Sequence, residues 1–247
     1  MPAFGPLSTL FRDADIPQAS VAEVDWYAAR ITREISRSLE LMCGSGRMLA
    51  PLMARGHHIH GVDASPAMIA SCEARLAALG LSTTLFRQDV AQLNVPFRYG
   101  CAYICAGAFQ LIADPAAGAG MLARIRAHLV PPGLLILDCF VPSDAIQRLG
   151  APLVEVRTVK LGDGTQIALR SETTCFADAR LLRAENRYAH RRGSHLLGEE
   201  KETITHTWYT DAEVKALAKE AGFRHLETAA SPRDVGDAQT FVLTARI

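Results

Sequence analysis

Two apolar stretches joined through a glycine turn constrain the fold of this 247-residue chain more than any other feature. Residues 36–42 and 57–62 have the composition of buried strands, and residues 46–55 between them have a helical pattern. Gly44 and Gly46 lie at the turn, where the missing Cβ lets a ligand approach the backbone. Asp63 follows the second stretch, where a carboxylate can accept hydrogen bonds from both hydroxyls of a ribose. The pattern predicts a βαβ unit that binds a nucleoside.

Strand and helix patterns continue to alternate after this unit. Such alternation indicates a mostly parallel sheet that carries helices on both faces. We therefore expect the α/β class, with a Rossmann-like, doubly wound sheet of seven strands. Residues 1–19, which include Pro2, Pro6 and Pro17, are expected to form an irregular arm. Further strands are expected at 82–86, 100–105, 134–140, 223–229 and 239–246, and further helices at 20–33, 66–79, 118–129 and 211–220.

The alternation of strands and helices is interrupted over residues 151–207, which lack helical periodicity. Polar and apolar residues alternate there, with Arg183, Glu185 and Arg187 on one face, and turn signals fall at 162–164, 178–179 and 192–194. This pattern predicts three or four antiparallel strands in a meander, inserted after the fifth strand. We expect residues 1–142 and 207–247 to form one domain, and residues 143–206 to form a lid or substrate-binding subdomain.

The charge and cysteine content argue against several classes of protein. The chain has 26 Lys and Arg against 26 Asp and Glu, so no overall field attracts nucleic acid or an anionic membrane. Its six cysteines form no Cys-x-x-Cys pair and have no histidine spacing suited to zinc, so no metal is expected. No stretch reaches the roughly 18 apolar residues that span a bilayer. We expect a cytoplasmic monomer or homodimer without nucleic-acid or membrane partners.

The residues around the glycine turn favour one kind of nucleoside ligand. A dinucleotide site would have a third glycine, but Leu49 occupies that position. Glu40 lies four residues before Gly44, and a carboxylate beside the turn would repel a pyrophosphate. The same carboxylate suits a ligand that carries a cationic amine and a sulfonium. Alternatively, Glu40 is a buried acid paired with Arg47 or another base.

Residues 39–47 resemble the first motif of the class I S-adenosylmethionine-dependent methyltransferases of the small-molecule type, with Met42 where a glycine is usual. Residues 63–69, 87–90, 103–111, 128–136 and 208–223 resemble further segments of that family, so the likeness covers about residues 20–140 and 207–247. It implies S-adenosyl-L-methionine as cofactor and S-adenosyl-L-homocysteine as product. The cofactor-binding residues that it implies are Tyr27, Glu40, Met42, Gly44, Gly46, Asp63, Ala64, Met68, Asp89, Val90, Cys105 and Gln110.

The resemblance also implies roles for individual residues. Asp63 would bind the ribose, and Asp89 would reach the adenine amino group with help from the backbone of the next residue. Tyr27 would meet the carboxylate of the cofactor, unless it only packs as part of its helix. His206 lies near the return of the meander, where a solvated histidine is the alternative. The catalytic candidates beside the methyl acceptor are Tyr27, His206 and Tyr209.

The activity implied is in-line transfer of a methyl group to an N atom, or less readily an O atom, of a small-molecule acceptor. Because a sulfonium supplies the reactivity, the protein mainly positions two reactants and excludes water. An O acceptor would more often need a base or a metal, which favours N-methylation. Two alternatives stay open: a non-catalytic protein that binds S-adenosylmethionine or S-adenosylhomocysteine, and an NAD(P)-dependent oxidoreductase.

Overall fold

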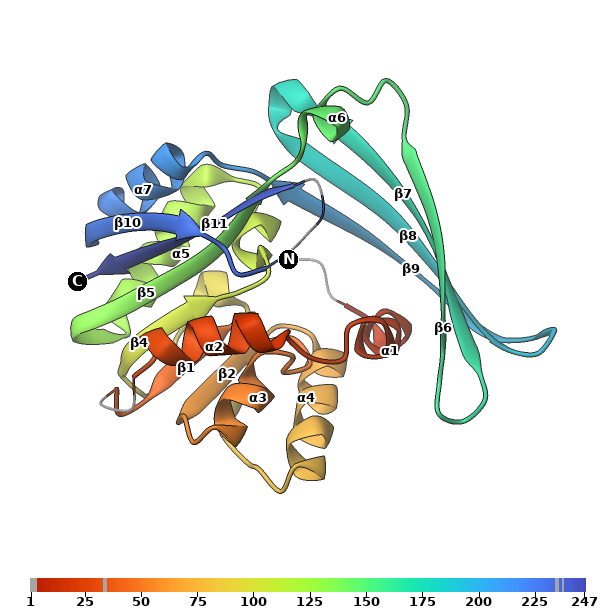
Figure 1. The fold of residues 1–247 in the computed structure, drawn as a ribbon, viewed down its shortest axis with the longest axis horizontal. Helices are drawn as coiled ribbons and strands as arrows, with labels where there is room; N and C mark the ends of the chain where they lie inside the picture. The colour runs from red at the N-terminus through yellow and green to blue at the C-terminus, as the bar shows by residue number, and fades with distance from the viewer. Residues whose placement is uncertain (1–3, 33–34, 234–235, 237) are drawn as a thin grey trace.

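The computed structural model describes residues 4–32, 35–233, 236 and 238–247. A seven-stranded sheet in the order β10-β11-β5-β4-β1-β2-β3 forms the centre of the fold, and a separate four-stranded sheet extends to one side of it (Figure 1). The strands β1 to β5 are parallel, whereas β11 is antiparallel to both β5 and β10. The strands are β1 (Ser38–Leu41), β2 (Ile59–Asp63), β3 (Leu85–Arg87), β4 (Tyr99–Ile104), β5 (Leu129–Val141), β10 (Arg224–Ala230) and β11 (Gln239–Arg246). The predicted Rossmann-like sheet is confirmed.

Helices cover both faces of this sheet, and each face has its own apolar core. The α2, α3 and α4 side buries Val24, Leu52 and Cys72, while the α5 and α7 side buries Leu122 and Val214. The helices are α1 (Pro6–Asp15), α2 (Val21–Arg30), α3 (Leu49–Ala54), α4 (Pro66–Ala78), α5 (Pro115–Ala127), α6 (Asp144–Gln147) and α7 (Asp211–Glu220). Short 3₁₀ turns are η1 (Val90–Gln92), η2 (Ala108–Leu111) and η3 (Ala177–Ala179).

Capping residues explain where several helices begin. Thr210 and Glu213 form the expected capping box at α7, and Ser65 accepts a hydrogen bond from the N–H of Met68 at α4. Helix α5 begins three residues earlier than the sequence predicts, because Asp114 caps it ahead of a proline at the first helical position. Gly118 and Gly120 lie within this helix and obscure its pattern in the sequence.

The expectation of an irregular arm over residues 1–19 was wrong, because residues Pro6–Asp15 form helix α1. The helix lies between α4 and the four-stranded sheet (Figure 1). Phe11 on its buried face packs edge-on against Tyr188, with ring centroids 5.7 Å apart. Long-range packing of this kind stabilises a short helix that local propensity alone would leave marginal.

The inserted segment forms four antiparallel strands in the sequential order β6-β7-β8-β9. These strands are β6 (Leu153–Lys160), β7 (Gln166–Phe176), β8 (Leu181–Arg192) and β9 (His195–Thr207). One face of this sheet lies toward α1 and the carboxyl ends of the main sheet (Figure 1). We call residues 143–206 the lid, with the boundaries expected from the sequence.

Gln110 joins the point where the chain enters the lid to the point where it returns. Its Nε2 donates to the carbonyl oxygens of Phe140, at 2.8 Å, and Thr207, at 2.9 Å. Its Oε1 accepts from the N–H of Phe140 at 2.7 Å, and the residue is fully buried. Gln110 was predicted to bind cofactor, but backbone groups occupy its side-chain amide. It also lines neither of the two cavities at the carboxyl ends of the main sheet.

We expect Gln110→Leu to destabilise the protein by about 3 kcal/mol or more, because three backbone groups lose their partner in a dry environment. Urea unfolding followed by circular dichroism measures this change. Gln92→Leu, at an exposed glutamine on η1, is the matched control and should change stability by less than about 0.5 kcal/mol. Equal effects of the two substitutions would contradict the role assigned to Gln110.

Candidate active site

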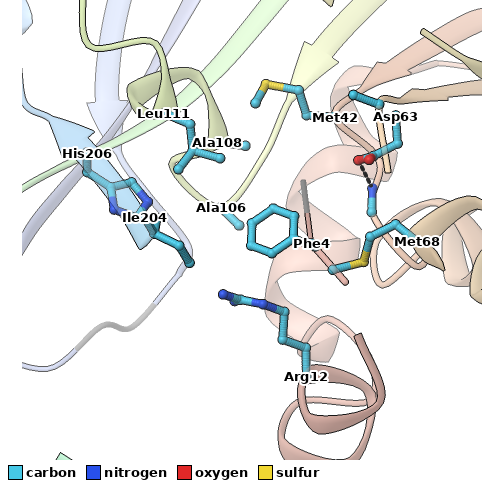
Figure 2. Close-up of a pocket in the computed structure, with 12 residues that line it drawn as sticks. Phe4, Arg12, Met42, Asp63, Met68, Ala106, Ala108, Leu111, Ile204 and His206 are labelled. Atoms are coloured by element: carbon cyan, nitrogen blue, oxygen red, sulfur yellow. Dashed lines mark hydrogen bonds between the residues drawn. The ribbon is translucent and has the colours of Figure 1, made fainter. Parts of the chain in front are cut away.

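Two adjoining cavities lie between the carboxyl ends of the main sheet, helix α1 and the inner face of the lid. The smaller one measures about 190 Å³ and the larger one about 570 Å³, and they share wall residues that include Met42, Ala106 and His206. Figure 2 shows the side chains around the smaller cavity. Ligands of open α/β sheets bind at this edge, and the pair of cavities is therefore the candidate active site.

Asp63, at the end of β2, holds the two turns that border the smaller cavity. One carboxylate oxygen accepts from the N–H of Gly44 at 2.9 Å (Figure 2). The other accepts from the N–H of Ser65 at 2.8 Å. Burial raises the pKa of this carboxyl, while the backbone hydrogen bonds oppose the rise. Each oxygen has a further lone pair, so the carboxylate can accept hydrogen bonds from a ribose without losing its backbone partners.

Two turns beside the cavities place non-glycine residues in left-handed backbone conformations. Met42, after β1, has a φ of 56°, and Ala106, after β4, also has a φ of 56°. A side chain in this region costs on the order of 1–2 kcal/mol, and such strain gathers at functional sites. Glycine adopts such a φ without strain, which gives a physical reason for the glycine at this position in the motif that residues 39–47 resemble.

Glu40, on β1, is 1% exposed and lines the larger cavity. Its carboxylate accepts hydrogen bonds from Tyr103 Oη at 2.9 Å and Cys105 Sγ at 3.4 Å. The alternative ion pair with Arg47 is not formed, because that arginine binds Glu23 of α2 at 2.9 Å. Burial raises the pKa of Glu40 to about 7, against which the two hydrogen bonds act. A cationic group in the cavity would favour the ionised form.

Tyr27, on α2, is 2% exposed, and its hydroxyl has no hydrogen-bond partner among the described residues. Its ring packs against Trp26 and Tyr103. Burial, followed by the charges of Cys105 and Asp138, raises the pKa of the phenol well above its ordinary value. A buried hydroxyl without a partner is costly, but Tyr27 lines neither cavity, so its predicted contact with the cofactor stays a prediction.

His206, near the end of β9, lines both cavities, and its ring contacts that of Phe140 at a centroid distance of 5.6 Å. Burial and the nearby Arg12 and Arg233 lower its pKa to about 4, so the imidazole is neutral at pH 7. Tyr209 lies elsewhere: its ring packs on Phe109, and it lines neither cavity.

The structure brings together most of the predicted cofactor residues and leaves others apart. Asp89 caps η1 by accepting from the N–H of Ala91, and Val90 is fully buried behind it. Neither residue lines a cavity, and Gly46 does not either. The predicted residues that do line a cavity are Glu40, Met42, Gly44, Asp63, Ala64, Met68, Cys105 and His206.

The wall residues that the sequence analysis did not predict include Phe4 and Arg12 from the amino-terminal segment, Ile204 from the lid, and Arg233. Arg233 Nε binds Asp138 Oδ2 at 2.8 Å, and that oxygen also accepts from the N–H of Ala106 at 3.0 Å. The start of α1 had a signal in Pro6, a residue favoured at the first helical position. No local sequence pattern marks Arg12, Ile204 or Arg233 as wall residues.

Comparison with known proteins agrees with this geometry. Residues 39–133 match the family described as a methyltransferase domain. A putative methyltransferase of Geobacillus sp. (strain WCH70) is 26% identical over 102 residues, a match that spans 41% of this chain and 41% of that protein. The chain thus covers well under half of the length of this curated relative.

Solved structures share the fold over nearly the whole chain. An S-adenosylmethionine-dependent methyltransferase from Clostridium acetobutylicum ATCC 824 has a TM-score of 0.77 at 15% identity, with 96% of each chain covered. The sugar N-methyltransferase KedS8 from Streptoalloteichus sp. ATCC 53650 has a TM-score of 0.75 at 21% identity, covering 96% of this chain and 92% of that one. CalS10, an amino pentose methyltransferase from Micromonospora echinaspora, has a TM-score of 0.69 at 22% identity, covering 95% of this chain and 96% of that one.

Residues 39–133 thus match a methyltransferase domain in sequence, and the whole chain has the fold of S-adenosylmethionine-dependent methyltransferases. The cofactor of this family is S-adenosylmethionine, and the cavity walls fit it, since Asp63 offers free lone pairs and Glu40 offers a buried carboxylate. Within the described residues, no three His, Cys, Asp or Glu side chains are grouped to hold a metal ion. Among the helices that the structure describes, none has the length and apolarity to cross a bilayer.

We expect Asp63→Ala to weaken binding of S-adenosylhomocysteine about 100-fold or more, because hydrogen bonds to a charged group contribute about 1.5–3 kcal/mol each. Isothermal titration calorimetry measures the affinity. Asp114→Ala, which removes the cap of α5 at a residue that lines neither cavity, should leave the affinity unchanged. An unchanged affinity in Asp63→Ala would show that Asp63 does not bind the ribose.

We expect Glu40→Gln to alter how stability depends on pH. The raised pKa means that the folded chain keeps a proton that the unfolded chain releases, so the contribution of Glu40 to stability falls between about pH 4.5 and 7. The uncharged variant should therefore gain roughly 2–4 kcal/mol over the wild type between pH 5 and pH 8. Urea unfolding at both pH values measures this difference in stability. Glu199→Gln, at an exposed position, is the control, and its difference from the wild type should be the same at both pH values. If the free energy of unfolding changed with pH by the same amount in Glu40→Gln and the wild type, Glu40 would not be a buried, protonated group.

Proposed function

We propose that this chain transfers a methyl group from S-adenosylmethionine to an amine nitrogen of a small polar molecule. The observation that carries the proposal is the larger cavity, which adjoins the Asp63 cavity and is walled on one side by the lid. Its lid wall offers neutral hydrogen-bonding groups in Ser171, Asn186 and His206. Such a wall suits an acceptor rich in hydroxyl and amino groups.

The bound cofactor supplies the electrophilic methyl group, and the chain positions the acceptor. The Met42 and Ala106 turns border both cavities, so the reacting centre is expected between them. The neutral imidazole of His206 can accept an N–H of the amine, which leaves the nitrogen lone pair free to face the methyl group. The lid and α1 exclude water, which strengthens these hydrogen bonds.

The low pKa of His206 supports nitrogen rather than oxygen as the acceptor atom. A hydroxyl group needs a base to remove its proton, and a group with a pKa of about 4 is a weak base at neutral pH. A neutral amine attacks without such a base and releases its proton after transfer. The fold neighbours described as a sugar N-methyltransferase and an amino pentose methyltransferase give independent support.

The test pairs each amine with its hydroxyl counterpart, beginning with D-glucosamine and D-glucose and extending to a panel of amino sugars. The purified chain is incubated with S-adenosylmethionine, and methylated product is measured by mass spectrometry. Product from amines alone is expected. Product from the hydroxyl counterparts alone would overturn the choice of nitrogen, and bound cofactor without turnover of any acceptor would favour a non-catalytic binding protein.

With an acceptor in hand, we expect His206→Phe to lower kcat about 10–100-fold, because the aromatic ring keeps its packing but loses the acceptor nitrogen. Tyr209→Phe is the matched control, since its hydroxyl lies outside both cavities, and kcat should stay within about twofold. Affinity for S-adenosylhomocysteine should be unchanged in Tyr209→Phe. A loss of activity confined to Tyr209→Phe would reverse these two assignments.

A further inference from the structure

Phe4 places an aromatic ring inside the smaller cavity, in a segment outside the matched residues 39–133. Figure 2 shows the ring between Ala106 and the Asp63–Met68 side of the cavity. It therefore lies beside the carboxylate that suits a ribose, together with Ala64 and Met68 in the same wall.

The ring is held at this position from two sides. The carbonyl oxygen of Phe4 accepts a hydrogen bond of 2.5 Å from Ser65 Oγ, and the N–H of Ser65 binds Asp63. The guanidinium carbon of Arg12 lies 4.5 Å from the ring centroid, which is within the range of cation–π attraction. Anchoring to Ser65 fixes the ring relative to the Asp63 carboxylate.

Helix α1 connects this aromatic group to the lid. The carboxylate of Glu200, on β9, accepts from the N–H groups of Leu7 and Ser8 at 2.9 and 3.0 Å. A Cβ at Gly5 would lie 2.5 Å from this carboxylate, so the glycine permits the close approach. Arg12 also binds Glu202 of β9 at 3.3 Å. The position of the ring thus depends on the lid.

The same helix borders the larger cavity. Phe11, Arg12, Asp15 and Ile16 all line it, and Asp15 forms an ion pair with Arg157 of β6 at 2.6 Å. On its other side, α1 is fixed to α4, where Asp13 binds Arg75 at 2.8 Å. One short element therefore walls both the Asp63 cavity and the cavity assigned to the acceptor.

We propose that residues 4–15 form a strap that closes over the cofactor, with the ring of Phe4 packed on its adenosine part. The Glu200 hydrogen bonds hold the strap shut, so cofactor enters and leaves when these bonds open. The inference rests on the cofactor of the domain and not on the identity of the acceptor, so it survives if the proposed N-methylation fails.

Binding measurements on the full chain test the contact. We expect Phe4→Ala to weaken binding of S-adenosylhomocysteine about tenfold, as for loss of an aromatic platform under a base, and Phe4→Tyr to keep the wild-type affinity. Binding of 5′-methylthioadenosine, which lacks the amino-acid part, should fall by the same factor, because the ring is assigned to the adenosine part. Leu10→Ala, at an exposed position on α1, is the control.

Three outcomes of this experiment would overturn the contact. Tighter binding by Phe4→Ala would mean that the ring obstructs the site, and unchanged binding would mean that it makes no contact. A loss confined to S-adenosylhomocysteine would place the ring at the amino-acid end. Failure of wild-type protein to bind either nucleoside would instead count against the cofactor itself, which separates the two failures.

The strap is tested by dissociation rates. We expect Glu200→Gln to speed release of S-adenosylhomocysteine about three- to tenfold in stopped-flow displacement, because hydrogen bonds to a neutral group are weaker than those to a charged one. Glu199→Gln, at the neighbouring exposed position on β9, should leave the rate unchanged. Equal release rates in wild type and Glu200→Gln would overturn the link between lid docking and cofactor exit.

Discussion

The site depends on one carboxylate that holds two turns. Asp63 accepts N–H groups from the turn after β1 and from the start of α4, which brings two neighbouring parallel strands to a common edge. Hydrogen bonds to a charged group are among the stronger ones in proteins, so the spacing between Gly44 and Ser65 is well defined before any ligand arrives. Phe4 is then fixed through Ser65, and one wall of the smaller cavity is fixed with it.

The charged side chains of the site either form ion pairs or have a pKa shifted toward the neutral form. Arg47 binds Glu23, and Arg233 binds Asp138, so these two half-buried guanidinium groups each have a carboxylate partner. Glu40 has no ion-pair partner among the described residues, and burial raises its pKa instead. The site thus holds one carboxyl whose charge state a cationic ligand can change, within an environment that is already oriented.

Much of the fold follows from local sequence patterns, since the glycine turn, Asp63 and the capping boxes act within a few residues. Helix α1 could not be predicted in this way, because it is stabilised by contacts with the lid. The ring of Phe11, the guanidinium of Arg12 and the N–H of Leu7 all bind residues almost 200 positions away in the sequence. Gln110 and Tyr209 match the expected motifs in sequence, yet packing directs their side chains to backbone groups and to the core. Side-chain direction is a tertiary property that spacing alone does not fix.

Because Gln110 binds the backbone at both Phe140 and Thr207, the lid is attached to the domain at two adjacent points. An insertion whose ends lie side by side can be lengthened, shortened or replaced without displacing the strands that carry it. Changes between those two points would alter which molecules fit against the domain, while Asp63 and the glycine turn stay in place. Under the proposed function, the arrangement gives evolution a module that can be exchanged to match new acceptors while the main sheet stays unchanged.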